Sequence, residues 1–486
     1  MPVGTCGPGT VLVNGICTPH LTGGAGGGVG SGGAPHASGG GGAIGGTGGK
    51  HGGEVAGASA TGGVGVAGAG GADIAGCSGA AGNEVSGMAG VAGDGGAGAA
   101  AAGFAGSAAG FGGSDAGAAG FAGSGAGTAG SAVAIDGGRA SGNYLIDAAH
   151  DNLQPNDAVA SPLSPRWAET LSGVVTYPVI AQGRLFVGTS DGTVTALDAH
   201  TGTTLWDPHL FPSGDSSARV MVATELDRVY ALTRDGLLSG LDATNGHVIW
   251  SERLVGQYFF WSAPVAAGGY VYVNGLESGG TTYAVNGATG EVAWTAGTFD
   301  GSFGTVAVGG DRVYEAEACD QLSAFESATG KLAWYTVSSC TGGGGTTPAF
   351  YNGWIWERDW ATGNMIIGAD KVKHGTFSSS IPPAFDGELV FYVNAGVLSA
   401  IDIASGKPVW AFSDDLGLCG AAAVAGARGQ VFVGSSSGTV YELDAATGHE
   451  ISSAHVDSYN CTLEVNALAI AGGHLFVPSG NRLIAF

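Results

Sequence analysis

Basic residues are scarce in this chain. Its 486 residues include 16 Lys and Arg against 40 Asp and Glu, which gives a formal net charge of −24. Because a nucleic-acid backbone or an anionic membrane surface attracts clustered positive charge, this composition argues against both kinds of partner. The sequence also lacks a run of about 20 apolar residues, which a membrane-spanning helix needs. We therefore expect neither a nucleic-acid partner nor a transmembrane segment.

Sequence motifs for redox or metal chemistry are also missing. The chain has no Cys-Cys pair, no C-x-x-C, no C-x-x-C-H haem motif and no H-E-x-x-H zinc motif, and its 11 His are scattered. Glu315 and Glu317 alternate on one predicted strand near Asp320. We interpret this cluster as a solvent-exposed acidic strand rather than a Ca²⁺ site. We expect no catalytic residue, no metal site and no cofactor.

Glycine, by contrast, is abundant, and much of it lies in one segment. Residues 21–130 hold 45 Gly and 29 Ala among 110 positions, whereas all 10 Trp lie at or after Trp167. Such small side chains cannot bury enough apolar area to offset the entropy lost on ordering. We predict a short segment at 1–20, a disordered Gly/Ala-rich tether at 21–140 and a globular body at 141–486. A stacked Gly-rich solid or a cell-wall association motif is the alternative for the tether.

The body repeats one pattern several times. Residues 183–206 read GRLFVGTSDGTVTALDAHTGTTLW, and related segments recur at 227–250, 269–294, 311–334, 387–410 and 429–451. In five of the six, an acidic residue or Asn stands eight positions before a Trp, and a Gly stands four positions before it. The residues of this pattern are Asp198, Gly202 and Trp206; Asp242, Gly246 and Trp250; Asn286, Gly290 and Trp294; Glu326, Gly330 and Trp334; Asp402, Gly406 and Trp410; and, without a Trp, Asp444 and Gly448. Repetition at this spacing indicates an array of similar supersecondary units.

Each unit is predicted to be a four-stranded antiparallel meander. Residues 184–187 and 193–197 are rich in β-branched and aromatic types, which favour strands. Asp191-Gly192 between them is a strong hairpin signal. The carboxylate of Asp198 can accept hydrogen bonds from the following backbone, and Gly202 can supply a positive φ to close the next turn. A unit of about 40 residues with four strands is the size of a propeller blade.

The repeat spacing predicts an all-β, eight-bladed propeller. The Asp, Asn or Glu position of each unit falls at 198, 242, 286, 326, 370, 402 and 444, the fifth of them in a degenerate unit. An eighth unit begins at Gly473 but stops at Phe486 before its last strand. We expect residues 164–167, which end at Trp167, to supply that strand and close the ring. Seven blades is the alternative, if residues 348–380 do not form a full unit.

These units resemble the pyrroloquinoline-quinone-like (PQQ-like) β-propeller repeat. The resemblance rests on DGTVTALDAHTG at 191–202 and SGTVYELDAATG at 437–448. That family includes quinoprotein dehydrogenases and the scaffold lipoprotein of outer-membrane barrel assembly. The element CGPGTVLVNGIC, followed by Gly/Ala-rich sequence, is similar to envelope proteins of myxobacteria. A dehydrogenase would imply a bound quinone, a Ca²⁺ ion, an Asp base and commonly a disulfide between adjacent cysteines, and this last feature is absent.

We therefore expect a non-catalytic secreted or cell-envelope propeller that acts as a protein-interaction or ligand-binding scaffold. Its partner would be an envelope or extracellular protein, a peptide or a glycan. The alternatives are a dehydrogenase that uses PQQ with Ca²⁺, and a structural cell-surface protein. The predicted binding surface is the mouth of the central channel, at Tyr177, Arg219, Tyr258, Trp261, Asp300, Phe303, Glu464 and Asn466. Packing between blades is the alternative role for about half of the residues there.

The seven cysteines favour an oxidising compartment. We predict disulfides between Cys6 and Cys17, between Cys319 and Cys340, and between Cys419 and Cys461, which leaves Cys77 unpaired. The last of these pairs occupies matching places in adjacent units. We expect the protein in the periplasm, at the outer-membrane surface or outside the cell. Because MPVGTCGPGT shows no export signal, the start would be misassigned or the chain processed. A reduced cytosolic protein is the alternative.

Overall fold

The computed structural model describes residues 10–13, 16–19, 140–211, 218–276, 279–299, 301–319, 321–336, 345–359, 363–368, 370–461 and 466–486. The chain divides into two units, Met1–Ala118 and Ala119–Phe486. In the first unit, β1 (Thr10–Val13) and β2 (Ile16–Pro19) pair as an antiparallel hairpin. Cys6 and residues 20–139 lie outside the described residues, so the disulfide of the hairpin, the tether and the domain boundaries stay predictions.

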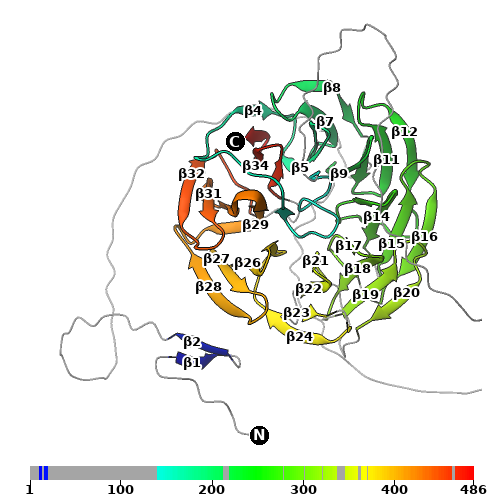
Figure 1. The fold of residues 1–486 in the computed structure, drawn as a ribbon. Coiled ribbons are helices and arrows are strands. Elements are labelled where there is room, and N and C mark those ends of the chain that lie inside the picture. The colour runs from blue at the N-terminus through cyan, green and yellow to red at the C-terminus, as the bar shows by residue number, and fades with distance from the viewer. Residues whose placement is uncertain are drawn as a thin grey trace, which may run out of the picture. The chain divides into compact units, whose positions relative to one another are not determined.

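Eight four-stranded antiparallel blades surround a common centre in the described part of the second unit (Figure 1). Blades 1 to 4 consist of β5 (Val175–Ala181), β6 (Arg184–Thr189), β7 (Thr193–Asp198) and β8 (Thr204–Leu210); β9 (Val220–Glu225), β10 (Arg228–Thr233), β11 (Leu237–Asp242) and β12 (Val248–Arg253); β13 (Val265–Ala267), β14 (Tyr270–Gly275), β15 (Thr281–Asn286) and β16 (Val292–Gly297); and β17 (Ala307–Gly309), β18 (Arg312–Glu317), β19 (Gln321–Glu326) and β20 (Leu332–Tyr335). Blades 5 to 8 consist of β21 (Ala349–Tyr351), β22 (Trp354–Asp359), β23 (Gly363–Ile367) and β24 (Lys373–Phe377); β25 (Ala384–Asp386), β26 (Leu389–Asn394), β27 (Val397–Asp402) and β28 (Lys407–Phe412); β29 (Leu418–Ala425), β30 (Gln430–Ser435), β31 (Thr439–Asp444) and β32 (Glu450–His455); and β33 (Ala469–Ala471), β34 (His474–Ser479), β35 (Arg482–Ala485) and β4 (Trp167–Thr170). A short 3₁₀ turn, η1 (Gly426–Arg428), joins β29 to β30, and β3 (Leu153–Gln154) pairs in parallel with β29.

Burial along a blade explains why its inner strands are almost continuously apolar. In blade 1, all but the first residue of β6 are buried, whereas in β8 only Trp206 is. Both faces of the inner strands pack against neighbouring blades, so neither face favours polar residues. The outer strands lie at the rim of the ring, so their side chains are mostly exposed. The fold class predicted from the repeats is confirmed.

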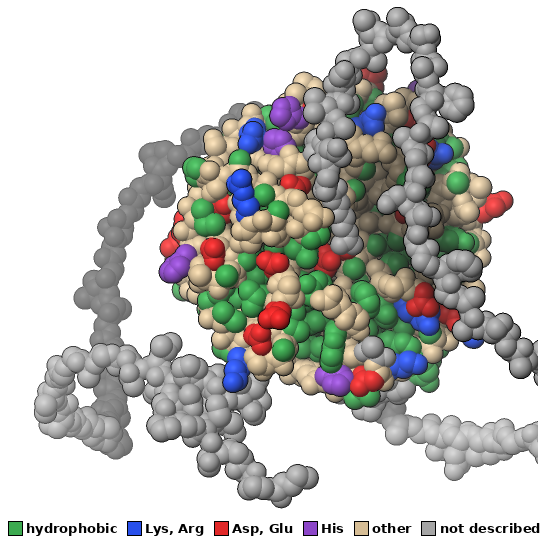
Figure 2. Space-filling view, in the orientation of Figure 1, with side chains coloured by type: hydrophobic (Ala, Val, Ile, Leu, Met, Phe, Trp, Pro, Cys, Tyr) green, Lys and Arg blue, Asp and Glu red, His purple; other side chains and the backbone are tan. Residues whose placement is uncertain are grey.

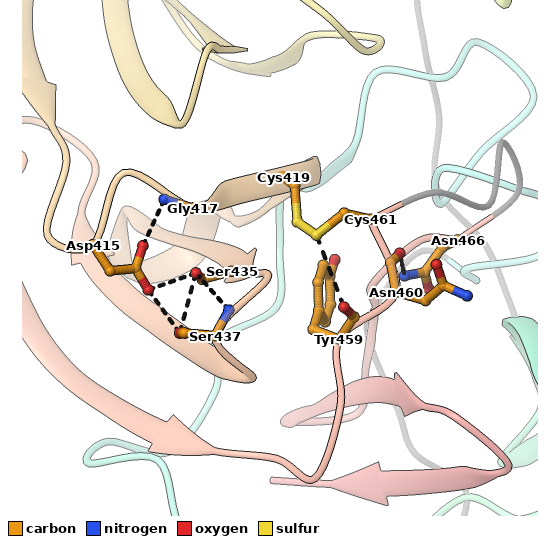
Figure 3. The surroundings of a disulfide bond; sticks show 9 residues. All are labelled: Asp415, Gly417, Cys419, Ser435, Ser437, Tyr459, Asn460, Cys461 and Asn466. Carbon is orange, nitrogen blue, oxygen red and sulfur yellow. Dashed lines mark hydrogen bonds between the residues drawn. A yellow bond between two sulfur atoms is a disulfide. The ribbon is translucent and has the colours of Figure 1, made fainter. Parts of the chain in front are cut away.

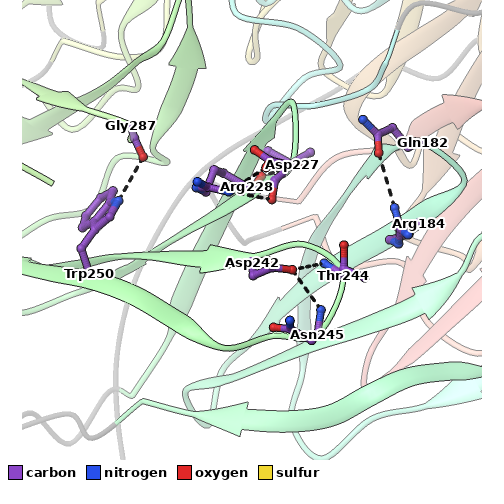
Figure 4. Close-up of polar contacts among 10 residues, drawn as sticks. Gln182, Arg184, Asp227, Arg228, Asp242, Thr244, Asn245, Trp250 and Gly287 are labelled. Atoms are coloured by element: carbon purple, nitrogen blue, oxygen red, sulfur yellow. Dashed lines mark hydrogen bonds and ion pairs between the residues drawn. The ribbon is translucent and has the colours of Figure 1, made fainter. Parts of the chain in front are cut away.

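The turn between the third and fourth strands is built as its residues predict. In blade 1, Oδ1 of Asp198 accepts hydrogen bonds from the backbone N–H groups of His200 at 3.0 Å and Thr201 at 2.8 Å. Gly202 has a φ of +74° and donates its N–H to the carbonyl of Asp198 at 2.8 Å. A glycine adopts this left-handed conformation without the steric cost that other residues bear. The blade 2 turn, with Asp242 as the acceptor, is drawn in Figure 4.

The Trp and the Gly of one repeat unit belong to two different contacts between blades. In blade 2, a Cβ atom on Gly246 would lie 2.6 Å from the ring of Trp206 in blade 1, while Trp250 packs in turn on Gly290 of blade 3 at the same spacing. Trp250 Nε1 also donates to the Gly287 carbonyl of blade 3 at 3.0 Å (Figure 4). The same ring-on-glycine contact joins Trp167 to Gly202, Trp294 to Gly330 and Trp410 to Gly448. These two residues therefore join adjacent blades at five of the eight junctions.

Blade 5 lacks this contact but is complete. Gly375 pairs with Ile366 at the register position that Trp occupies in blade 6. The turn before the outer strand starts at Gly368, whose N–H donates to the Val372 carbonyl at 3.1 Å, and Lys371 has the positive φ. The acidic position predicted at 370 was therefore misplaced by two residues, because this turn is shorter by one residue. Since all four strands are present, the seven-bladed alternative is wrong.

The ring closes as predicted, with a strand borrowed from the other end of the body. β4 pairs antiparallel with β35, and Trp167 lies opposite Ala485. In Figure 1 this strand lies beside the C-terminal strands. At the junction of blades 7 and 8, where blade 8 has no Asp-x-x-x-Gly turn, Glu442 instead accepts hydrogen bonds from Gln430 at 2.6 Å and Ser161 at 3.0 Å. A polar network thus replaces the ring-on-glycine contact at the closure.

Residues 141–154, which we call the axial plug, lie near the centre of the ring of blades (Figure 1). In each of blades 1 to 7, the next-to-last residue of the first strand donates its backbone N–H to an oxygen atom of the plug, at 2.6–3.1 Å. The donors are Ile180, Thr224, Ala266, Val308, Phe350, Phe385 and Val424. For the eighth blade, the hydroxyl of Ser141 donates to the carbonyl of Ile470 at 2.6 Å. The plug therefore binds every blade at the same position. Four of its residues hold a left-handed backbone, namely Leu145, Ile146, His150 and Asn152.

Candidate functional site

A cavity of about 180 Å³ lies on the channel axis. Most of its wall comes from the segments that precede the first strands of blades 3 to 6 and 8. Blade 7 contributes Gly420 and Ala421 of β29, and the axial plug contributes the ring of Tyr144. These segments and the turns between second and third strands lie at one end of the ring, called here the mouth face. The plug binds near the opposite ends of the first strands, so the cavity opens toward the mouth. We call this cavity the axial pocket.

Arg358 is the cation of the axial pocket. It lies on β22, it is 6% exposed, and one of its terminal nitrogens donates to the Ser380 carbonyl. Its Nε atom has no hydrogen-bond partner, and no carboxylate of a described residue forms an ion pair with it. Burial lowers the pKa of this guanidinium to about 10, which still leaves it charged at neutral pH. Tyr144 and the charge of Glu357 act against this lowering. A buried cation that no ion pair with a described carboxylate holds favours an anionic group from outside.

Hydroxyl groups tie the pocket wall together across blades. Thr305 Oγ1 accepts the N–H of Ala263 at 2.9 Å, and Thr347 Oγ1 accepts the N–H of Thr305 at 3.0 Å. Thr346 Oγ1 donates to the Arg358 carbonyl at 3.0 Å. These bonds are fully buried and link blades 3, 4 and 5. The wall beside Arg358 is thereby held in a fixed geometry.

Trp261 forms the aromatic side of the pocket. The guanidinium of Arg234 lies 3.9 Å from its ring centre, and that of Arg219 lies 5.8 Å away. Arg234 also lies 5.6 Å from the ring of Phe259, which is 42% exposed. Next to it, Tyr258 is 72% exposed. Exposed rings and the arginines stacked on them give this side of the mouth an aromatic rim.

A disulfide forms part of the opposite wall. Cys419 of β29 and Cys461 of the segment before blade 8 are bonded, as the sequence predicts, and Cys461 lines the pocket (Figure 3). Asn466 donates to the carbonyl of Asn460 at 2.5 Å. Cys319 is also disulfide-bonded, whereas its predicted partner Cys340 lies outside the described residues.

The structure brings only some of the predicted mouth residues together. Trp261, Phe303 and Asn466 line the axial pocket, Arg219 lies over Trp261, and Tyr258 is exposed beside it. Tyr177 is fully buried, and its hydroxyl donates to the Val222 carbonyl at 2.7 Å, so it packs between blades 1 and 2. Asp300 and Glu464 lie outside the described residues.

Sequence reasoning missed Arg358 and Tyr144. The second strands of the other blades have an apolar, small or amide residue at the register position of Arg358; these residues are Gly188, Leu232, Asn274, Ala316, Val393, Gly434 and Pro478. Comparing the units position by position would have shown the lone charge. Tyr144 belongs to the plug, which has no repeat with which to compare it.

The interpretation of Glu315 and Glu317 as a solvent-exposed strand is wrong. Both side chains are buried between blades, where Thr282 donates to Glu315 and Ser323 to Glu317, and the Phe299 N–H donates to Glu317 at 2.7 Å. Burial, followed by the neighbouring Glu317 charge, raises the pKa of Glu315 to about 8. The two acidic side chains of this strand accept hydrogen bonds inside the protein and are not exposed to solvent.

The described wall of the axial pocket does not fit a Ca²⁺ ion. It offers hydroxyls, amides and the guanidinium of Arg358 but no carboxylate, which is the usual ligand of this hard cation. Within the described ranges, no group of three or more His, Cys, Asp or Glu side chains is placed to hold a metal ion. In the same ranges, no helix is both long enough and apolar enough to cross a bilayer.

Comparison with known proteins supports this fold. A family model described as outer membrane protein assembly factor BamB matches residues 157–258, 234–353 and 394–486. BamB from Moraxella catarrhalis is 17% identical, with a TM-score of 0.50 over 66% of this chain and 96% of that one. Quinohemoprotein alcohol dehydrogenase from Comamonas testosteroni is 15% identical, with a TM-score of 0.56 over 72% and 80%. The computationally designed Ika8 protein is 16% identical, with a TM-score of 0.53 over 65% and 98%. No curated protein matches the chain.

Proposed function

Because this chain belongs to the PQQ-like β-propeller family described as outer membrane protein assembly factor BamB, we propose that it is a non-catalytic binding scaffold of the cell envelope or cell exterior. The ligand we assign to its axial pocket is a carboxylate carried by a peptide or protein partner. The pocket would take the acidic side chain, and the aromatic rim around Tyr258 and Phe259 would contact the backbone beside it. PQQ-like structures at this level of identity share a fold and not an activity.

The observation that carries this proposal is the state of Arg358. A guanidinium presents donors in a planar fork that matches a carboxylate, and this one is buried with its Nε unsatisfied. Burial excludes water from around the charge, so a bound carboxylate would gain more here than at the surface. The pocket, at about 180 Å³, is smaller than the roughly 300–1,000 Å³ of pockets for drug-sized molecules. A single side chain therefore suits it better than a whole cofactor.

Two further features support a partner outside the cytoplasm. The Cys419–Cys461 disulfide lies in the pocket wall, and such bonds persist in oxidising compartments. The named neighbour BamB is an outer membrane protein assembly factor, which places one relative in the envelope. For this chain, the location and the class of partner are part of the proposal.

The test uses two capped pentapeptides that differ in one central residue, Glu in one and Gln in the other. Titration calorimetry with the full chain should show tighter binding of the Glu peptide, because only that peptide offers a carboxylate to Arg358. A charged hydrogen bond of about 1.5–3 kcal/mol corresponds to a preference of tenfold or more. Arg358→Gln should abolish the preference, whereas the matched change Arg253→Gln, at an exposed ion pair with Asp235, should leave it intact.

Equal binding of the two peptides, or a preference that survives in Arg358→Gln, would refute the proposal. Far-UV circular dichroism of each variant separates a lost contact from a lost fold. A parallel assay with PQQ, Ca²⁺, an artificial electron acceptor and an alcohol addresses the alternative. Turnover above that of the same mixture without the protein would identify a dehydrogenase instead of a scaffold.

A further inference from the structure

A second cavity lies at the place where the ring closes, away from the mouth. Its volume is about 330 Å³, and its wall comes from blades 7, 8 and 1 and from the segment between the plug and β4. The side chains that matter here are Arg166, Arg428, His200 and His474. We call this cavity the closure cleft. It shares no residue with the axial pocket.

The closure cleft gathers positive charge in a strongly acidic protein. Figure 2 shows Lys or Arg and His side chains close together over the region where β4 and β34 lie in Figure 1. Arg166 precedes β4, Arg428 ends η1, and His474 begins β34. With 40 acidic residues against 16 basic ones in the chain, two arginines side by side with two histidines form a local exception.

These two arginines also lack the partners that other arginines have. Arg228, Arg253, Arg312 and Arg482 each form an ion pair with a carboxylate. Neither Arg166 nor Arg428 forms an ion pair or a side-chain hydrogen bond with any described residue. Their guanidinium groups are therefore available to a ligand that enters the cleft.

The two histidines lie next to each other in the wall. Their rings are 5.5 Å apart, and Nδ1 of His474 lies 3.3 Å from the Phe486 carbonyl, to which it donates. Burial lowers the pKa of His474, and the charge of Arg166 lowers it further. Asp157 acts in the opposite direction but contributes less than Arg166 does. Arg166 is thus the charge that this ring senses most strongly.

Asp157 has a structural task at the edge of the cleft. Its Oδ1 atom accepts the N–H of Ala158 and the N–H of Gly473, both at 2.9 Å, which holds the turn before His474. It adds one negative charge against the two guanidinium groups. Among the charged side chains named here, two guanidinium groups therefore stand against one carboxylate.

We propose that the closure cleft binds a phosphate or phosphomonoester group through Arg166 and Arg428. Guanidinium groups bind such oxyanions through paired hydrogen bonds, and two of them match a group of charge near −2. A cleft of about 330 Å³ accommodates the oxyanion together with part of the molecule that carries it. The histidine rings supply further polar contacts at the side. This inference is independent of the function proposed for the axial pocket, because the two cavities can be disabled separately.

Binding is tested by titration calorimetry of the full chain at low ionic strength, with inorganic phosphate and with glycerol 3-phosphate. The expected result is saturable binding with a Kd of about 1 mM or tighter. The double variant Arg166→Gln/Arg428→Gln should weaken it at least tenfold. Neither side chain has a bonding partner to lose, so the thermal unfolding temperature should not change. The control Arg253→Gln/Arg482→Gln removes the same two charges elsewhere and should bind as the wild type does.

Three results would overturn the proposal: no saturable binding to the wild type, undiminished binding to the cleft variant, or an equal loss in the control. A second arm uses vesicles of phosphatidylglycerol and phosphatidylcholine. Vesicle binding that the cleft variant loses identifies a lipid headgroup as the source of the phosphate and supports the site. Vesicle binding that the cleft variant retains argues against it.

Discussion

Gly448 and Gly406 form a matched pair for testing the contact that joins the blades. They lie in equivalent turns of blades 7 and 6, with φ values of +70° and +64°. A Cβ atom on Gly448 would lie 2.5 Å from the ring of Trp410, whereas a Cβ atom on Gly406 would meet nothing within 4 Å. The substitutions Gly448→Ala and Gly406→Ala therefore share one cost and differ in a second.

The shared cost is the left-handed backbone, which destabilises Ala by about 1–2 kcal/mol relative to Gly. The second cost arises only at Gly448, because the Trp410 ring has to shift to admit a methyl group. Overpacking of this kind costs about 1–3 kcal/mol. We therefore expect Gly448→Ala to lower the free energy of unfolding by about 2–5 kcal/mol, against about 1–2 kcal/mol for Gly406→Ala.

Urea unfolding followed by far-UV circular dichroism measures both changes under one condition. The double variant Trp410→Ala/Gly448→Ala completes the comparison: once the ring is gone, the glycine substitution should cost no more than it does at Gly406. Equal losses for the two single variants would refute the idea that the ring-on-glycine contact holds adjacent blades. So would an unchanged cost of Gly448→Ala in the Trp410→Ala background.

Two further predictions concern the axial plug. Asn143→Ala removes both side-chain hydrogen bonds to the backbone of Ala266, at 2.7 and 3.1 Å. Because a buried N–H and a buried carbonyl are left unpaired, the free energy of unfolding in urea should fall by about 2–4 kcal/mol. A loss below about 1 kcal/mol would contradict the structural role of the plug. Burial lowers the pKa of His150 to about 4 from its ordinary 6.5. The contribution of the neutral His150 to stability is therefore complete above pH 6.5 and is lost as the pH falls toward 4, by up to about 3 kcal/mol. His150→Gln should flatten the fall in unfolding temperature between pH 6.5 and 4, and an unchanged pH profile would show that this histidine is not the group responsible.

The architecture could be predicted from the sequence because the blades repeat both their packing and their amino-acid pattern. An Asp-x-x-x-Gly turn and a Trp recur at fixed spacing because each meets the next blade in the same way. The borrowed closing strand was also predictable, since the last unit ended early and Trp167 stood alone at the other end. The degenerate turn near Lys371 was misplaced because a shorter turn leaves no such pattern.

The candidate site was harder to read because its residues follow no repeat. The plug is joined to the blades mainly through backbone carbonyls, which any sequence provides. Its amino-acid sequence therefore has no pattern from which the plug could be predicted. Arg358 stands out only once the register of eight second strands is known. Tyr177 and Trp261 were predicted together, yet Tyr177 is buried inside β5 whereas Trp261 precedes β13 and lines the pocket.

The axial plug also constrains how the molecule is made. It leaves the ribosome before any blade, yet one of its bonds joins Ser141 to Ile470, 329 residues later. Contacts between such distant parts of a chain slow folding, and an unfinished ring exposes unpaired strand edges in the meantime. β4 and the plug contact with blade 8 must therefore stay unpaired until synthesis is nearly complete, so a chain released early cannot close its ring. We expect such truncated products to be degraded or to aggregate rather than to accumulate as smaller propellers.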